Sequence, residues 1–187
     1  MNILKIHTLL KNRKLTYKEA EQILYDFGRN ERFKIFIALF DATLKNDMNI
    51  AFKVFREAYC SSDNIFKQIN ESELKFNLKS FLKCIKVNRI NFIEEMHENE
   101  KKYYDELPNN FKIYRGISQV EFDSKDFGIS WSLCEETAKN YVYFDKNEVE
   151  KGKGAIIDIV VKKEEIMTVF SVNNDIEIIY LHKISTE

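Results

Sequence analysis

The sequence is short of the residues that break or cross-link a chain. Its 187 residues include one proline, five glycines and three cysteines. The cysteines, Cys60, Cys84 and Cys134, are odd in number, lie far apart and include no C-x-x-C pair. That pattern is typical of neither a disulfide framework nor a zinc site. With only three histidines scattered along the chain, we expect reduced thiols and no metal site.

Long apolar runs are also missing. No stretch approaches the roughly 18 apolar residues that a transmembrane helix needs, and the first residues lack the apolar centre and cleavage site of a signal peptide. We therefore expect a protein that stays in the cytoplasm, or is delivered into a host cytoplasm, and has no membrane partner. The formal net charge of −1 gives no indication of nucleic-acid binding. The oligomeric state cannot be predicted from the sequence.

Amphipathic helical patterns fill residues 1–107. Thr16 followed three residues later by Glu19 predicts a capping box at the start of one helix. Apolar residues recur at three- and four-residue spacing, and the aromatic ones among them, mostly phenylalanine, form a stripe that is typical of the packed core of a helical bundle. Pro108, the only proline, ends the helical pattern. The region carries no catalytic constellation, so we interpret it as a scaffold or a target-recognition module.

Residues 108–187 form a predicted β-rich region. Period-two patterns and turn residues divide it into predicted elements: a strand over 111–117, a polar loop over 118–126, a strand over 128–133, a helix over 135–144, a strand over 155–161, a short helix over 164–170, a loop over 171–174 and a strand over 176–181. The predicted fold class is therefore α+β, with a helical N-terminal half packed on a mixed or antiparallel β C-terminal half.

One charged residue of the predicted strand over 111–117 shares a face with apolar residues. Arg115 falls on the same side of the strand as the apolar residues Phe111, Ile113 and Ile117. Arginine cannot lose its proton to escape burial, so a semi-buried arginine requires an anionic partner. That partner is either a carboxylate of the protein or a phosphate of a ligand.

Two later strands carry residues that could complete a site with Arg115. Ser130 and Ser132 place two hydroxyls on one face of their strand, where they can bind a ligand amide or orient a carboxylate. Glu177 shares the face of Ile179 on the last strand, so it is a second charge in phase with apolar residues. An arginine, a serine pair and a carboxylate on three strands of one small β unit indicate a ligand cleft.

The order of these segments resembles that of the ADP-ribosyltransferase family, in the Arg-Ser-Glu branch related to bacterial toxins and phage effectors. The similarity covers about residues 111–182. Three motifs carry it: Tyr114-Arg115-Gly116 resembles the arginine of the family's first strand, Ser130-Trp131-Ser132 its Ser-Thr-Ser strand, and Asp175-Ile176-Glu177 its Glu-x-Glu strand. Two further segments are similar: Ala138 and Tyr141 match the small and aromatic positions of the helix after the serine strand, and residues 160–166 resemble the strand-then-helix approach to the target loop.

The resemblance implies an ADP-ribosyltransferase fold and a mono-ADP-ribosyltransferase, an effector or toxin that uses NAD as its substrate and releases nicotinamide. It implies a macromolecular acceptor, a protein in preference to a nucleic acid. Glu177 would stabilise positive charge on the ribose, Arg115 would bind the diphosphate, and Ser130 would hold the catalytic carboxylate. The implied catalytic residues are Glu177, Asp175 and Ser130, and the implied NAD-binding residues are Arg115, Tyr114, Gly116, Ser130, Trp131, Ser132 and Tyr141.

The sequence departs from the family pattern at two positions. Trp131 replaces the usual threonine, with its side chain expected to point away from the serines. Asp175 stands where arginine-modifying members carry the first glutamate, so the acceptor can be arginine, another side chain, a nucleic acid or water. Residues 170–174 would face that acceptor. Two other interpretations stay open: an NAD glycohydrolase, and a non-catalytic interaction module in which Arg115 and Glu177 form a structural ion pair.

Overall fold

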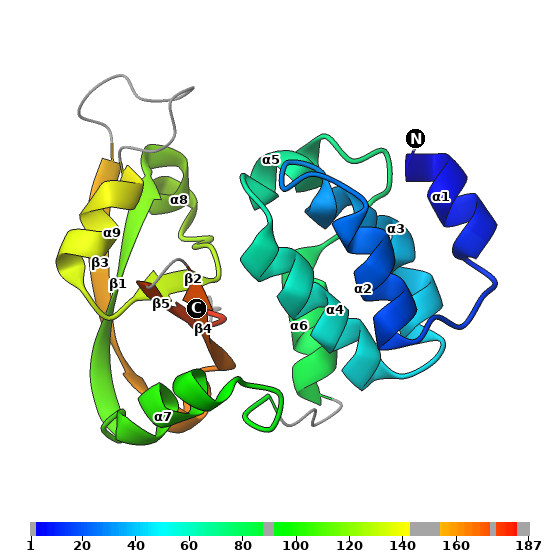
Figure 1. Cartoon of the computed structure of the whole chain (residues 1–187). Helices are drawn as coiled ribbons and strands as arrows, with labels where there is room; N and C mark the ends of the chain where they lie inside the picture. Colours follow the sequence, from blue (N-terminus) through cyan, green and yellow to red (C-terminus); the bar gives the residue numbers. More distant parts are fainter. Residues whose placement is uncertain (1–2, 88–91, 143–153, 173–174, 183–187) are drawn as a thin grey trace. The chain divides into compact units, whose positions relative to one another are not determined.

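The chain forms two compact units, Met1–Ile90 and Asn91–Glu187, in the computed structural model shown in Figure 1. The first unit is helical, and the second combines helices with a five-stranded antiparallel sheet. The predicted α+β class is therefore confirmed, and the sheet is antiparallel. The structure describes residues 3–87, 92–142, 154–172 and 175–182.

The N-terminal unit is built around phenylalanine side chains on two neighbouring helices. Its helices are α1 (Ile3–Leu10), α2 (Tyr17–Tyr25), α3 (Arg32–Leu44), α4 (Met48–Ser61), α5 (Ile65–Asn70) and α6 (Leu78–Val87). Phe33 and Phe36 of α3 and Phe55 of α4 are fully buried, and their rings lie 5.4 to 6.2 Å apart. The aromatic stripe is therefore packed core, as the sequence predicts.

One local motif that the sequence predicts for this unit is a helix capping box. The predicted capping box opens α2: the Thr16 backbone N–H donates to Glu19 Oε2 at 2.9 Å, and the Glu19 N–H donates to Thr16 Oγ1 at 3.3 Å. This satisfies donors that the first turn of a helix leaves open. In the part of the chain that the structure describes, no helix is both long and apolar enough to cross a membrane.

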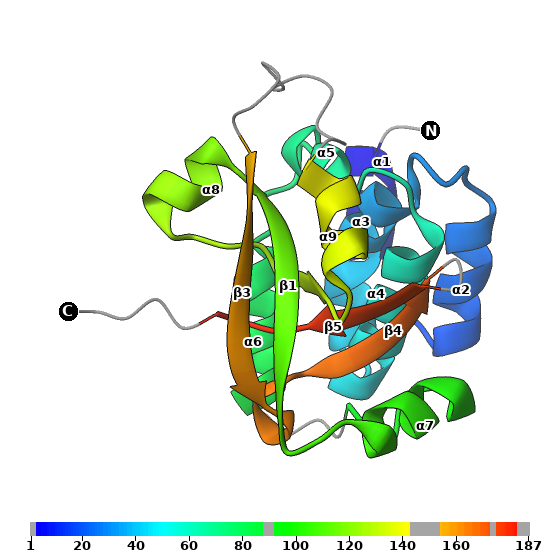
Figure 2. The same cartoon turned by 90° about the vertical axis from the view of Figure 1, so that its left-hand side faces the viewer.

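The C-terminal unit orders its strands β3-β1-β2-β5-β4. In Figure 2 the long β1 and β3 lie side by side, and β4 and β5 run across them. The short β2 joins the two pairs through its neighbours β1 and β5. The elements are α7 (Glu98–Glu106), β1 (Asn110–Ser118), α8 (Gln119–Ser124), β2 (Ser130–Ser132), α9 (Glu135–Val142), β3 (Gly154–Lys162), the 3-10 turn Lys163–Glu165, β4 (Thr168–Val172) and β5 (Asp175–Ile179).

Three predicted elements differ from the structure. The predicted helix over 164–170 is a 3-10 turn over Lys163–Glu165, and the chain from Thr168 onward is strand β4. The predicted loop over 171–174 therefore begins with two strand residues, since Val172 pairs with Asp175 of β5. Strand pairing with β5 outweighs the local helical pattern of this segment, because the side chains of Val169 and Phe170 in β4 are fully buried. The polar segment 118–126 is also not all loop, because it contains α8.

Buried side chains lie on both faces of the sheet, since Thr168, Phe170 and Ile179 are buried on the face of Glu177. The hydrophobic cluster around Trp131 lies on the other face. Ile113, Ile117, Trp131, Val169 and Ile178 belong to it, and all are almost completely buried. These residues occupy alternate positions of β1, β2, β4 and β5, as period-two strands require. The helix predicted over 135–144 is α9, described as far as Val142.

Helix α7 belongs to the sheet unit rather than to the helical one. Its Glu100 is fully buried. Glu100 Oε1 accepts a hydrogen bond from the Ser171 N–H of β4 at 2.8 Å, and Oε2 accepts one from the His97 N–H at 2.8 Å. The division between units therefore lies before α7, earlier in the chain than residues 107 and 108. The change from helix to strand still occurs at Pro108, between α7 and β1.

We predict that Glu100→Gln lowers the free energy of unfolding by about 1 to 3 kcal/mol, because the amide turns one of two acceptors into a donor that faces a backbone N–H. Chemical denaturation measures this change. Glu98→Gln is the matched control on the same helix, where the exposed side chain should cost about 0.5 kcal/mol or less. Equal effects of the two substitutions would show that Glu100 does not anchor α7.

Candidate active site

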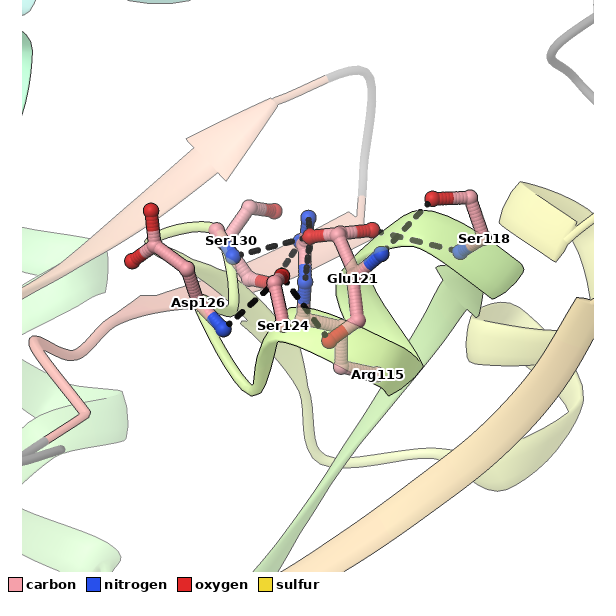
Figure 3. A network of polar contacts seen from close by, with 7 residues as sticks. Arg115, Ser118, Glu121, Ser124, Asp126 and Ser130 are labelled. Atoms are coloured by element: carbon pink, nitrogen blue, oxygen red, sulfur yellow. Dashed lines mark hydrogen bonds and ion pairs between the residues drawn. The ribbon is translucent and has the colours of Figure 1, made fainter. Parts of the chain in front are cut away.

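Arg115 lies on the core side of β1, in phase with Ile113 and Ile117 as the sequence predicts. Its side chain is 13% exposed. The guanidinium donates to Glu121 Oε1 from Nη2 at 2.7 Å and from Nε at 3.2 Å, and Nη1 donates to the Ser130 carbonyl at 2.7 Å (Figure 3). The anionic partner that Arg115 requires is therefore Glu121 of α8.

The Glu121 carboxylate gathers further donors. Oε1 also accepts from the Gly128 N–H at 2.9 Å, and Oε2 accepts from the Ser118 N–H at 3.3 Å. Ser118 Oγ in turn accepts from the Glu121 N–H at 3.2 Å, which completes a capping box at the start of α8. Sequence reasoning missed Glu121. The signal that could have identified it is the spacing of Ser118 and Glu121, the same S/T-x-x-E pattern as at Thr16.

Gly128 is the residue that lets the guanidinium lie where it does. A Cβ atom built on Gly128 would lie 2.1 Å from Arg115 Nη2 and 2.6 Å from Arg115 Cζ. These distances are far below van der Waals contact. Any side chain at position 128 would therefore displace the guanidinium from Glu121 and from the Ser130 carbonyl.

Strand pairing brings the three motif segments side by side. Tyr114 of β1 pairs with Ser132 of β2, and Ser132 pairs with Glu177 of β5. Directly opposed residues in antiparallel strands project from the same face, with Cβ atoms about 4.5 to 5.5 Å apart. Ser132 is thus the serine opposite Glu177, whereas Ser130 pairs with Ile179.

The structure separates the predicted site residues between the two faces of the sheet. One face of the sheet carries four of them. Ser132 and Glu177 pair directly, and Ser130 and Asp175 each lie two residues away along the same strand, so all four side chains project from this face. Arg115 follows Tyr114 along β1 and faces the core on the other side. The structural ion pair of Arg115, for which the sequence left Glu177 open as a partner, forms with Glu121 instead.

The remaining predicted residues occupy different surroundings. Trp131 is 2% exposed and points into the core, where its ring packs against Phe127 and Tyr180. Its side chain points away from the two serines, as predicted. Gly116 is half-buried in β1 and pairs with Ile156 of β3. Tyr141 lies in α9, and its side chain falls outside the described part of the structure.

Tyr114 has a charged neighbour on its own face. The Lys112 ammonium lies 5.9 Å from the centre of the Tyr114 ring and forms an ion pair with Asp158 of β3 at 2.9 Å. The hydrogen bond and charge of Asp158 raise the pKa of Lys112. Tyr114 is half-buried, and it is the aromatic residue that pairs directly with Ser132.

Ser132 also organises the turn into α9. Its Oγ accepts a hydrogen bond from the Cys134 N–H at 3.0 Å, and its own O–H stays available to donate. The thiol of Cys134 lies exposed at the start of α9. Hydrogen bonds from the backbone N–H groups of Thr137 and Glu136, and from the Thr137 side chain, lower the pKa of Cys134.

Two open hollows on the described surface both belong to the N-terminal unit, one beside Leu4 and one beside Arg13. Nor, among the residues that the structure describes, are three or more His, Cys, Asp or Glu side chains grouped to hold a metal ion.

Comparison of the chain with models of known protein families, with curated proteins and with solved structures gives no match. Functional inference therefore depends on the geometry of the site and on the sequence resemblance.

We predict that Gly128→Ala lowers the free energy of unfolding by about 2 kcal/mol, because the new methyl group pushes the guanidinium out of hydrogen bonds to a charged partner. Gly28→Ala is the matched control, since a Cβ there meets nothing within 4 Å. Thermal or chemical unfolding of the two variants measures the difference. If both variants unfold like the unsubstituted protein, the contact between Gly128 and Arg115 has no energetic importance.

We predict that iodoacetamide at neutral pH alkylates Cys134 several-fold faster than Cys84, although both thiols are exposed. A lowered pKa means that more of Cys134 is thiolate at neutral pH, and the thiolate is the nucleophile. Peptide mass spectrometry over a series of times and pH values gives both rates. The rate at Cys134 should level off at a lower pH than that of an ordinary thiol. Slower reaction at Cys134 than at Cys84 would contradict the hydrogen-bonded thiolate.

Proposed function

We propose that the C-terminal unit is a mono-ADP-ribosyltransferase that cleaves the bond between nicotinamide and ribose in NAD and passes ADP-ribose to an acceptor. The observation that carries this proposal is the register of the three central strands, which sets Tyr114, Ser132 and Glu177 in one row. The three segments that resemble the family motifs are thus adjacent in space, although they lie far apart in the sequence.

Glu177 has the surroundings that this chemistry needs. Cleavage breaks the bond between ribose C1′ and the nicotinamide nitrogen. The bonding electrons leave with nicotinamide, and positive charge builds on the ribose. A carboxylate held against that charge lowers the barrier by electrostatic stabilisation. Glu177 is half-buried, and the O–H of Ser132 lies opposite it in the register to orient it.

In this proposal Asp175 accepts the proton of the incoming acceptor. It lies on the same face of β5 as Glu177, two residues away and thus roughly 7 Å along the strand. Asp175 is exposed, so an acceptor from solution can reach it. As the acceptor forms its bond to C1′, its proton passes to this carboxylate. The acceptor thus approaches along the β4–β5 edge.

Hydrolysis of NAD is the second candidate function. In the sequence only two residues separate the end of β4 at Val172 from the start of β5 at Asp175. The segment expected to face the acceptor is therefore mostly strand, and it offers little surface for recognising a macromolecule. Water as the acceptor would need no such surface.

One experiment separates these functions. The purified protein is incubated with NAD that carries a label in its adenylate phosphate, with and without a cell lysate. Label on macromolecules supports the transferase, and free ADP-ribose without labelled macromolecules supports the glycohydrolase. Intact NAD under both conditions contradicts both and leaves the non-catalytic interaction module.

We predict that Glu177→Gln slows nicotinamide release by about 100- to 1000-fold, because the amide removes the charge that opposes the developing positive charge. Glu164→Gln, at an exposed position outside the row, is the control and should leave the rate unchanged. Chromatography of released nicotinamide measures both variants, and their unfolding temperatures confirm that they are folded. A Glu177→Gln variant that retains the full rate would rule out this mechanism.

A further inference from the structure

We propose that Glu121 occupies the anion site of Arg115, and that a diphosphate group displaces this carboxylate and releases α8 from β1. This inference rests on the proposed function, because it assigns Arg115 to the diphosphate of NAD. It adds a regulatory step at the same site: the arginine is not available to the substrate until Glu121 has left.

The contacts of Glu121 Oε1 are those of an anion site. Two N–H groups of the Arg115 fork and the backbone N–H of Gly128 converge on this single oxygen at 2.7 to 3.2 Å. A guanidinium fork next to a backbone N–H binds phosphate as readily as carboxylate. The missing Cβ at Gly128 leaves room for the guanidinium itself, which lies against the Gly128 backbone. Glu121 is thus an internal anion in a site that suits a phosphate oxygen.

Helix α8 is held at this site by polar contacts rather than by apolar packing. It has six residues, and none is buried. Val120 and Phe122 are 65% and 42% exposed, while Glu121, between them, points inward to Arg115. Lys125, with φ of 55°, ends the helix in the left-handed region. Because no residue of α8 is buried, movement of the helix exposes little apolar surface to water, and loss of the Glu121 contacts favours its release.

Release of Arg115 also explains how one ligand could use both faces of the sheet. Nη1 of Arg115 holds the Ser130 carbonyl at the start of β2, and Glu177 lies opposite Ser132 at its end. The two ends of β2 are roughly 7 Å apart. Once Glu121 leaves, the guanidinium remains beside the start of β2 as the cation for the diphosphate. The diphosphate and the nicotinamide ribose of one NAD molecule would then lie at the two ends of β2.

The affinity of a masked site is reduced by the fraction of molecules in which the site is open. Isothermal titration calorimetry with inorganic pyrophosphate as the probe measures this effect. We expect Glu121→Gln to bind pyrophosphate at least about tenfold more tightly than the unsubstituted protein, because the competing charge is gone. Asp123→Asn is the matched control, since it removes an exposed carboxylate from the same helix and should change nothing.

A second substitution assigns the gain in affinity to the proposed site. Arg115→Gln introduced into the Glu121→Gln variant should abolish the gain. The proposal is wrong if Glu121→Gln binds pyrophosphate no better than the unsubstituted protein, or if the gain survives the loss of Arg115.

Hydrogen exchange of the unsubstituted protein tests the same inference without relying on a variant that could misfold. We expect saturating pyrophosphate to speed amide exchange in residues 118–127, whereas a ligand that merely packs against α8 would slow it. Unchanged or slower exchange at saturation overturns the release of α8.

The outcomes also separate this inference from the proposed function. Tighter pyrophosphate binding without any cleavage of NAD would retain the anion site and reject the transferase. Cleavage of NAD that Glu177→Gln abolishes, with no effect of Glu121→Gln on pyrophosphate binding, would retain the transferase and reject the masking by Glu121.

Discussion

The ion pair between Arg115 and Glu121 is the contact on which the C-terminal unit depends. A guanidinium on the core side of β1 keeps its charge at every physiological pH, so the fold must supply an anion there. Glu121 supplies it at 2.7 Å, Gly128 leaves room for the guanidinium, and the Ser130 carbonyl accepts its third contact. One semi-buried charge thus accounts for the position of α8, for the glycine before β2 and for the attachment of β2 to β1.

Strand register is the second constraint. Fully buried Phe170 and Ile179 lie on the same face as Glu177, and a slip of one residue would turn the side chains of a strand to its other face. Burial of these two side chains therefore favours the register that sets Glu177 opposite Ser132.

Several features could be predicted because they depend on neighbours in the sequence. Period-two alternation placed Arg115 with Ile113 and turned Trp131 away from the serines, and Pro108 marked the change from helix to strand. The features that could not be predicted depend on distant residues. Residues 168–172 form a strand only because they pair with β5. Whether Arg115 and Glu177 share a face depends on register, which the period of each strand alone does not determine.

The role of Glu121 could be predicted only in part. Its capping box with Ser118 is a local signal, but its ion pair with Arg115 is not, and a polar stretch with exposed Val120 and Phe122 has the composition of a loop. The ion pair between Glu121 and Arg115 matters because it joins α8, a helix without buried residues, to strand β1.

A crystal structure of the protein with a non-cleavable NAD analogue would show whether the two groups of the site bind one NAD molecule. We expect the nicotinamide ribose to lie against Glu177 and Ser132, the diphosphate to bind the Arg115 guanidinium, and Glu121 to be displaced from it. An analogue bound elsewhere, with the ion pair between Arg115 and Glu121 intact and the Glu177 face empty, would rule out this assignment.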